Sequence, residues 1–281
     1  MVGPQTTLIS RRALLASALA PAAAQTIVRP PAAEARSYIA TAIVSFLGVT
    51  LLTRRGAAGG FARAAGENGE TVIEFAAGSH PDRCAGINRL GYIRESCGGS
   101  GGRRKIYGFM TVSREESFQE ARKALGNAGP EQPFVLIDST VDSAGCESHV
   151  ASVSCSSALR WPDWRAVEAE LMKRWPSAPK RVTRLPGAMP GFLSAVRTAM
   201  MQGGSGSLAY AHNDKQYALN WTVARARHGI AELDGRISGH GKARFKVWFD
   251  PSEPGAPPLA FEYQPKSYLR VRFDAVTGEQ S

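Results

Sequence analysis

Two histidine–aspartate pairs carry the side chains that acid–base chemistry needs. His212 and Asp214 lie two residues apart in the stretch AHNDKQY, and Asp138 precedes His149 near two of the cysteines. A carboxylate that orients an imidazole beside a nucleophile is the arrangement used by many hydrolases. Asn and Asp also favour hairpin turns for conformational reasons alone, which is the alternative explanation for the AHNDKQY stretch. Both pairs are therefore candidates for a spatially assembled hydrolase site, and no residue is assigned as catalytic.

Two glycine-rich stretches match catalytic or cofactor motifs in letters but not in context. Ser100 lies in GGSGG, where Cys97 precedes it and basic residues follow, whereas a nucleophile elbow needs a buried strand before the serine and a helix after it. The stretch GGSGSLA follows an expected helix and precedes an expected strand, the opposite order to a dinucleotide-binding turn. The chain has no Walker loop and no zinc-ligand spacing, so we expect neither a cofactor nor a metal.

Four cysteines, Cys84, Cys97, Cys146 and Cys155, permit three disulfide pairings. The local pairing, Cys84 with Cys97 and Cys146 with Cys155, closes two short loops and is the most economical. In an oxidising compartment two disulfides are expected, and free thiols are the alternative.

The N-terminal stretch SRRALLASALAPAAAQ has the organisation of an export signal. Arg11 and Arg12 precede an apolar run that is too short to span a membrane as a helix, and small residues follow it. The order Ser-Arg-Arg before leucines resembles the signal of the twin-arginine (Tat) route. We expect residues 1–24 to be a Tat-type signal peptide cleaved after Ala24, with the twin-arginine translocase as its partner. The mature chain is then periplasmic or secreted, and a Sec-type signal is the alternative.

The charge of the chain is unevenly distributed. Its 34 lysines and arginines exceed its 24 acidic residues by 10, and residues 158–281 hold 18 of the basic residues against 11 acids. A basic exported protein favours anionic partners such as anionic lipid, lipopolysaccharide or an acidic polymer. The expected compartment and the lack of a recognised binding motif argue against nucleic acid. A composition of 43% hydrophobic and 21% charged residues is typical of a folded globular protein.

The first half of the mature chain mixes strand and helix signals. Residues 25–37 are rich in proline and alanine and are expected to be a linker, and residues 38–157 an α+β part that carries the disulfides. The apolar run over 38–52 predicts one buried strand with a bend near Gly48. Asn68 and Gly69 predict a hairpin turn, and a capping box that starts at Ser113 predicts a helix over 113–126.

Residues 158–205 are expected to be a basic helical segment. Apolar residues from Trp164 to Trp175 recur at steps of three to four, which predicts a helix that begins near Pro162. A second short helix is expected before Gly203. The stretch SAPKRVTRLPG between them is expected to be a basic connector.

From residue 206 to residue 281 apolar and polar side chains alternate with a period of two. This period predicts strands with one buried face and one wetter face, and short polar links make them an antiparallel meander of about six strands. Such a meander has to protect its edges by closure or by a cover. The expected fold class is α+β, a mainly antiparallel β meander that forms a partial or closed barrel with about three covering helices. Residues 38–281 are compatible with one domain.

Basic and aromatic side chains of this meander are the candidates for ligand binding. The basic candidates at the expected rims are Arg244, Lys246, Arg270 and Arg272, and the aromatic ones are Trp221, Trp248 and Tyr263. Small barrels often hold one amphipathic molecule at their mouth. The same aromatic residues are also typical of a filled core.

The end of the chain resembles a known group of proteins. The pattern KARFKVWFDP followed by PPLAFEYQPKSYLRVRFDA is similar to the last strands of exported Gram-negative β-barrel proteins of unknown function. In those proteins a strand with tryptophan or tyrosine, a turn with proline and an arginine-rich last strand follow in order. The resemblance covers about the last quarter of the chain, implies a barrel in the cell envelope and supplies no catalytic residues.

The sequence therefore favours an exported envelope protein that binds an anionic or amphipathic ligand and is not an enzyme. One alternative is a secreted hydrolase that uses a His/Asp site. The other is a structural or protein-interaction barrel with a solidly packed interior.

Overall fold

The computed structural model describes residues 34–46, 49–67, 70–80, 82–83, 89–98, 103–112, 130–225, 227–239 and 243–276. The expected signal peptide, most of the expected linker and the helix expected over 113–126 lie outside these residues. Within them the chain is mostly antiparallel β-structure, as the sequence predicts. Two α-helices are present in the described parts, against about three expected. None of the described helices is long and apolar enough to cross a membrane.

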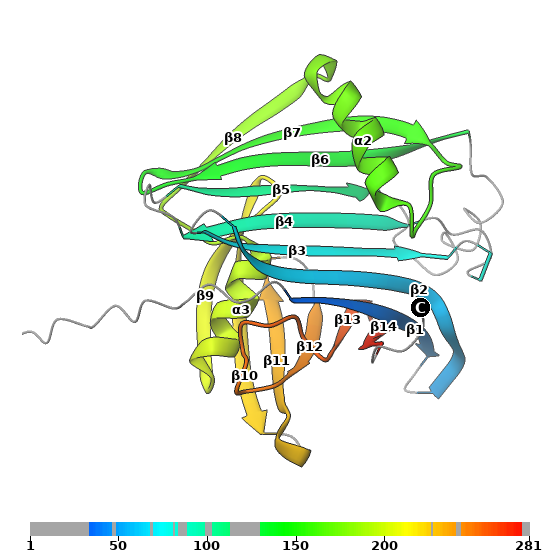
Figure 1. Ribbon diagram of the computed structural model, residues 1–281, viewed down its shortest axis with the longest axis vertical. Coiled ribbons are helices and arrows are strands. Elements are labelled where there is room, and N and C mark those ends of the chain that lie inside the picture. Colours follow the sequence, from blue (N-terminus) through cyan, green and yellow to red (C-terminus); the bar gives the residue numbers. More distant parts are fainter. Residues whose placement is uncertain are drawn as a thin grey trace, which may run out of the picture.

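Fourteen strands of the described chain form one sheet in which strands that are consecutive in sequence are neighbours, except at one junction (Figure 1). The first meander consists of β1 (Glu34–Phe46), β2 (Val49–Glu67), β3 (Glu70–Ser79), β4 (Leu90–Gly98), β5 (Arg104–Thr111), β6 (Glu131–Val141), β7 (Gly145–Ser156) and β8 (Lys180–Pro186). The second consists of β9 (Ser205–His212), β10 (Lys215–Arg225), β11 (Ala231–Ser238), β12 (Arg244–Phe249), β13 (Ala260–Lys266) and β14 (Leu269–Ala275). The helical elements are α2 (Trp164–Arg174), η1 (Trp175–Ser177), α3 (Phe192–Gln202) and η2 (Arg227–Gly229). Strand β1 pairs with β14, and this ladder joins the two meanders into a nearly closed barrel.

The N-terminal strands confirm one expected hairpin and correct another prediction. Glu67 lies opposite Glu70, so β2 and β3 form the expected hairpin, and residues 68 and 69 lie outside the described residues. The apolar run over 38–52 is two paired strands and not one bent strand, because Phe46 lies opposite Val49. Both arms of this hairpin are apolar, so hydrophobicity continues through the turn and hides it. Strand β1 already begins at Glu34, inside the segment expected to be a linker.

The basic connector between the two expected helices is also a strand. It forms β8, which pairs with β7 at one edge of the sheet, for example Thr183 with Ser148. Five of its seven residues are exposed. An edge strand that is open on both faces has no buried row, so the alternation that identifies strands is missing from its sequence.

The second meander follows the predicted alternation. Directly opposite residues of antiparallel strands share one face of the sheet, and the register places Leu233, Val247, Phe261 and Phe273 in one row across β11 to β14. This row points to the inside of the barrel. The intervening residues point outward.

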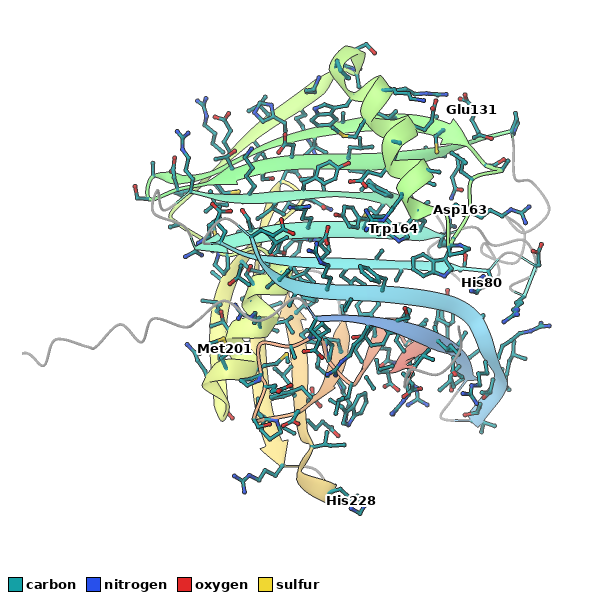
Figure 2. All side chains as sticks on the ribbon, in the orientation of Figure 1. His80, Glu131, Asp163, Trp164, Met201 and His228 are labelled. Carbon is teal, nitrogen blue, oxygen red and sulfur yellow. The ribbon has the colours of Figure 1, made fainter. Side chains whose placement is uncertain are left out.

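The two helices lie on opposite faces of the sheet. Helix α2 covers the outer face: Val167 and Leu171 are fully buried there, and the Trp164 ring stacks on Tyr92 of β4 with centroids 4.6 Å apart (Figure 2). Helix α3 lies inside the barrel, where Phe192 packs against Phe245 of β12 at 5.6 Å. One helix therefore shields the sheet from outside, and the other occupies part of the interior.

Strands β8 and β9 are the two ends of the sheet and do not pair with each other in the described structure. The segment before α3 crosses this seam: Gly191 forms an isolated parallel bridge with Ala211, and the Ala211 amide donates to the Pro190 carbonyl at 2.9 Å. An ion pair between Arg181 of β8 and Asp214 beyond β9 also spans the seam. The barrel is thus held together here by side chains and one connector, not by a ladder.

Candidate ligand-binding cavity

A cavity of about 630 Å³ lies between the inner faces of the two meanders. One wall comes from β2 to β6, the other from β9 to β14, and α3 and the loop before β13 complete the lining. Most of its lining is apolar, and its larger apolar side chains include Ile73, Phe75, Ile93, Ile106, Met110, Ile137, Phe192, Val196, Met200, Phe245, Val247, Phe261 and Phe273. Its volume is within the range of about 300–1,000 Å³ that is usual for small-molecule sites.

Strand alternation explains why this wall is apolar. Phe75, Ile93, Gly108 and Ile137 lie directly opposite one another along β3 to β6, so they form one inward row. Gly108 sits in the middle of this row, and a Cβ there would lie 2.6 Å from the backbone oxygen of Tyr92. The glycine therefore permits close strand packing and leaves a hollow in the wall between two isoleucines.

Polar groups of the β9–β10 hairpin gather at one part of the cavity lining: His212, Asn213 and Tyr217. Arg197 of α3 also belongs to the lining and lies close to Gly255 of the loop before β13. Asn213 adopts a left-handed backbone conformation with φ of 57°, as the turn requires. Its Oδ1 atom is buried and has no hydrogen-bond partner among the described residues. Burial is also the main cause that raises the pKa of Tyr217.

Helix α3 is anchored by a carboxylate that comes from the opposite wall. Glu95 of β4 is 1% exposed and accepts hydrogen bonds from the Leu193 amide at 2.8 Å, the Ser194 amide at 2.8 Å and the Ser194 hydroxyl at 2.5 Å. It takes the place of an N-cap side chain, because the N-cap residue is Gly191. Burial raises the pKa of Glu95, and the hydrogen bonds from Ser194 and Leu193 oppose that rise. This contact fixes the part of α3 that lines the cavity.

The histidine–aspartate pairs are placed differently from each other. His212 lines the cavity beside Phe192 and Tyr217, whereas Asp214 forms an ion pair with Arg181 across the seam. The AHNDKQY stretch is a hairpin turn, as its composition predicts: His212 lies opposite Lys215.

Asp138 and His149 face each other on the outer surface of β6 and β7. Asp138 is exposed, and His149 Nε2 lies 3.0 Å from Glu147 Oε1. Neither residue lines the cavity. In the described part of the chain no group of three His, Cys, Asp or Glu side chains is arranged to hold a metal ion.

Of the aromatic candidates for ligand binding, one lines the cavity. Tyr263 lies on its wall, next to the inward row of β13 and β14. Trp221 is buried in the core beside Leu219, and its Nε1 donates to the Gly203 carbonyl at 3.4 Å. Trp248 points to the other face of the sheet, where its Nε1 donates to Glu232 at 2.9 Å.

The basic candidates lie on the outer face of β12 and β14 and not on the wall of the cavity, because they occupy the outward positions of the alternation. Three of them have acidic partners: Lys246 Nζ is 2.5 Å from Glu232, Arg270 is 4.0 Å from Glu262, and Arg272 is 2.9 Å from Asp274. The Arg272 guanidinium also stacks over the Trp248 ring at 4.4 Å. Arg244 is exposed on the same face.

The expected disulfide between Cys146 and Cys155 is absent, and both residues are buried free thiols. They lie near opposite ends of β7. Nine residues of extended strand separate them by about 30 Å, whereas a disulfide needs Cα atoms roughly 4.4–6.8 Å apart. The sequence pattern favours a loop here because four serines lie in this strand and a glycine precedes Cys146. Cys84 and the side chain of Cys97 lie outside the described residues.

Several residues of the site carry no signal that local sequence could provide. Glu95 belongs to the first meander, whereas its partner Ser194 follows 99 positions later. The useful hint is Gly191, because a glycine at the start of a helix leaves its amides without a local cap.

The sequence matches no protein-family profile and no curated protein. Among solved structures, it is similar to the beta-barrel-like protein of domain of unknown function DUF1849 from Brucella abortus. That likeness has a TM-score of 0.48 and 8% identity, and it covers 88% of this chain and 98% of that chain. Function has to be inferred from the cavity and surfaces of the chain itself.

Proposed function

We propose that this chain is an exported envelope protein that binds one amphipathic molecule in the cavity of its barrel and does not catalyse a reaction. The observation that carries the proposal is the cavity of about 630 Å³ between the two meanders, with an apolar wall and a polar cluster at one part. A ligand with an apolar body gains free energy by leaving water for such a wall. Charged solutes without an apolar part lose more hydration than this wall returns.

The polar cluster supports a ligand with a polar or anionic end. Arg197 in the lining supplies a permanent positive charge. His212 and Tyr217 add groups that can donate or accept. The N-terminal Tat-type signal supports export, which makes lipids, lipopolysaccharide fragments and acidic amphiphiles of the envelope the relevant ligand classes.

Native mass spectrometry of the mature protein isolated from its own periplasm, followed by lipid extraction, tests this proposal. We expect a bound amphiphile of defined mass. A fluorescent fatty acid offered to the delipidated protein should bind saturably with a stoichiometry of one. Protein that carries no small molecule and gives no saturable probe binding would refute the proposal.

A matched pair of variants on α3 assigns the binding to the cavity. Val196 lines the cavity, whereas Met201 on the same helix is 42% exposed and does not line it (Figure 2). Val196→Trp puts a larger side chain into the cavity and should weaken probe binding by at least about tenfold, since lost apolar burial of ~1.5 kcal/mol is a factor of about ten. Met201→Trp should leave binding unchanged. Equal binding by both variants would place the ligand elsewhere.

A further inference from the structure

The first part of β2 extends past the edge of β3, and its described pairing there is with β1 alone. We call residues 41–45 and 49–55 the arm. All seven residues from Val49 to Arg55 are exposed, although they are paired with β1. Successive side chains of a strand point to opposite faces, so both faces of β2 are uncovered here.

A β-bulge separates the arm from the barrel wall. Ala40 lies opposite Ala58, but the next residue, Thr41, lies opposite Arg55, so Gly56 and Ala57 are extra in β2. Gly56 has φ of +70°, a backbone conformation that side chains rarely adopt. Bulges bend the strand that carries them, and Figure 1 shows β2 curving sharply away from the sheet toward its N-terminal end.

The arm carries large apolar side chains next to two arginines. Val49, Leu51 and Leu52 are 62%, 64% and 52% exposed, which is unusual for side chains of this size. Arg54 and Arg55 follow after Thr53 and are exposed as well. An apolar end with a basic collar is the pattern of segments that bind lipid surfaces.

The inner face of the arm continues into the cavity. Leu52 lies opposite Val44, and Val44 lies opposite Leu269 of β14. Two residues further along β14, Val271 lies opposite Tyr263, which is on the cavity wall. Apolar side chains therefore form a continuous row from the exposed arm to the cavity.

We propose that the arm docks on the surface of an anionic lipid bilayer. Val49, Leu51 and Leu52 insert at the boundary between headgroups and acyl chains, and Arg54 and Arg55 bind lipid phosphates. Both faces of β2 are open in the arm, so a lipid surface can surround its side chains, and the two arginines favour a surface of negative charge. This docking goes beyond the proposed cavity function and does not require an occupied cavity.

Vesicle co-sedimentation of the purified full chain tests the docking. We expect binding to vesicles of phosphatidylglycerol and phosphatidylcholine that weakens with salt, and little binding to phosphatidylcholine alone. Arg54→Gln with Arg55→Gln should weaken binding roughly 25-fold, since each basic residue near an anionic surface contributes about a factor of five. Leu51→Ser with Leu52→Ser should weaken it at least about tenfold.

Two double variants elsewhere on the surface are matched controls. Met172→Ser with Val182→Ser removes exposed apolar residues from α2 and β8, and Arg236→Gln with Arg244→Gln removes two exposed charges from β11 and β12. Both should bind vesicles like the wild type. Because every variant keeps the same N-terminal segment, differences between them belong to the substituted residues.

Each outcome decides the proposal. Loss of vesicle binding only in the arm variants, with far-UV circular dichroism, melting temperature and fatty-acid probe binding unchanged, supports it. Wild-type protein that ignores anionic vesicles, or arm variants that bind them as well as the wild type, overturns it. Arm variants that leave vesicle binding intact but dissociate a dimer in analytical ultracentrifugation would assign the arm to a second protein copy and also overturn it. Loss of probe binding in Val196→Trp with normal vesicle binding separates the cavity from the arm.

Discussion

Because Gly191 contacts Glu95, the substitution Gly191→Ala has two opposing effects on the stability of the protein. Gly191 has φ of −75° and ψ of 178°, which alanine adopts without strain. The backbone argument therefore predicts that Gly191→Ala stabilises the protein by about 0.4–1 kcal/mol, because the unfolded chain loses freedom. An added Cβ, however, would lie 2.4 Å from the Glu95 carboxyl carbon and from Oε1. The carboxylate would have to leave the start of α3.

The magnitudes decide the sign. The displaced carboxylate would lose hydrogen bonds from the Leu193 and Ser194 amides, each 2.8 Å long. A hydrogen bond to a charged group contributes about 1.5–3 kcal/mol, so losing two outweighs the backbone gain and leaves a net destabilisation of about 2–5 kcal/mol. For a chain of this size the melting temperature should fall by roughly 4–20 °C.

Urea unfolding followed by tryptophan fluorescence measures the effect, with Gly91→Ala as the matched control. Gly91 lies on the same strand as Glu95, and its added Cβ would meet other atoms only at 3.9 Å. In a Glu95→Ala background the clash is gone, so Gly191→Ala should then be neutral or slightly stabilising. An equal loss of stability in both backgrounds, or a gain in the wild-type background, would refute this explanation of the α3 anchor.

Three further predictions concern the buried Glu74, the two buried cysteines and the ion pair across the seam. Burial raises the pKa of Glu74, but hydrogen bonds from Tyr92 and Arg63 outweigh it and hold the pKa below its usual range. The ionised Glu74 carboxylate therefore stabilises the protein above about pH 4.3, and this stabilisation is lost as the pH falls through the lowered pKa. In urea unfolding, the free energy of unfolding of Glu74→Gln should be lower than that of the wild type at about pH 6, and the difference should shrink toward about pH 3. Burial also raises the pKa of the Cys146 and Cys155 thiols. In a variant that lacks the other two cysteines, a thiol reagent should therefore label these two only after the protein is unfolded. Rapid labelling of the native variant would contradict their burial. Asp214→Asn removes the ion pair across the seam. Amide hydrogen exchange in β9 should then become faster, and the free energy of unfolding should fall by less than about 1 kcal/mol. Unchanged exchange would show that the pair does not hold the seam.

The sequence predicts the second meander well because each of its strands buries one face only. The alternation around Val247 and Phe261 specifies both the strand and the side that faces inward. The same rule fails for β8, which has no buried row, and for the β1–β2 hairpin, whose apolar residues run through the turn. The local sequence pattern therefore identifies a strand best when one of its faces is buried and the other is exposed.

From the sequence, a cavity in the barrel could be predicted only as one of two alternatives, the other being a filled core. The sequence places Phe245 and Phe273 on an inward face, but whether that face is packed or hollow depends on Gly108 and Ile93 in the other meander and on α3. The basic residues were assigned to the rims from their charge. Their outward positions and acidic neighbours, such as Glu232 beside Lys246, emerge only from the register between strands.

The ladder between β1 and β14 also has a consequence for the order of folding. It pairs Tyr38 with Ala275, residues more than 200 positions apart, whereas the other ladders join consecutive strands. Local pairings form faster than distant ones because less chain entropy is lost before the first contact. Each meander therefore forms first, and closure of β1 onto β14 is the late step. Because both meanders supply its wall, the cavity is complete only once this ladder has formed.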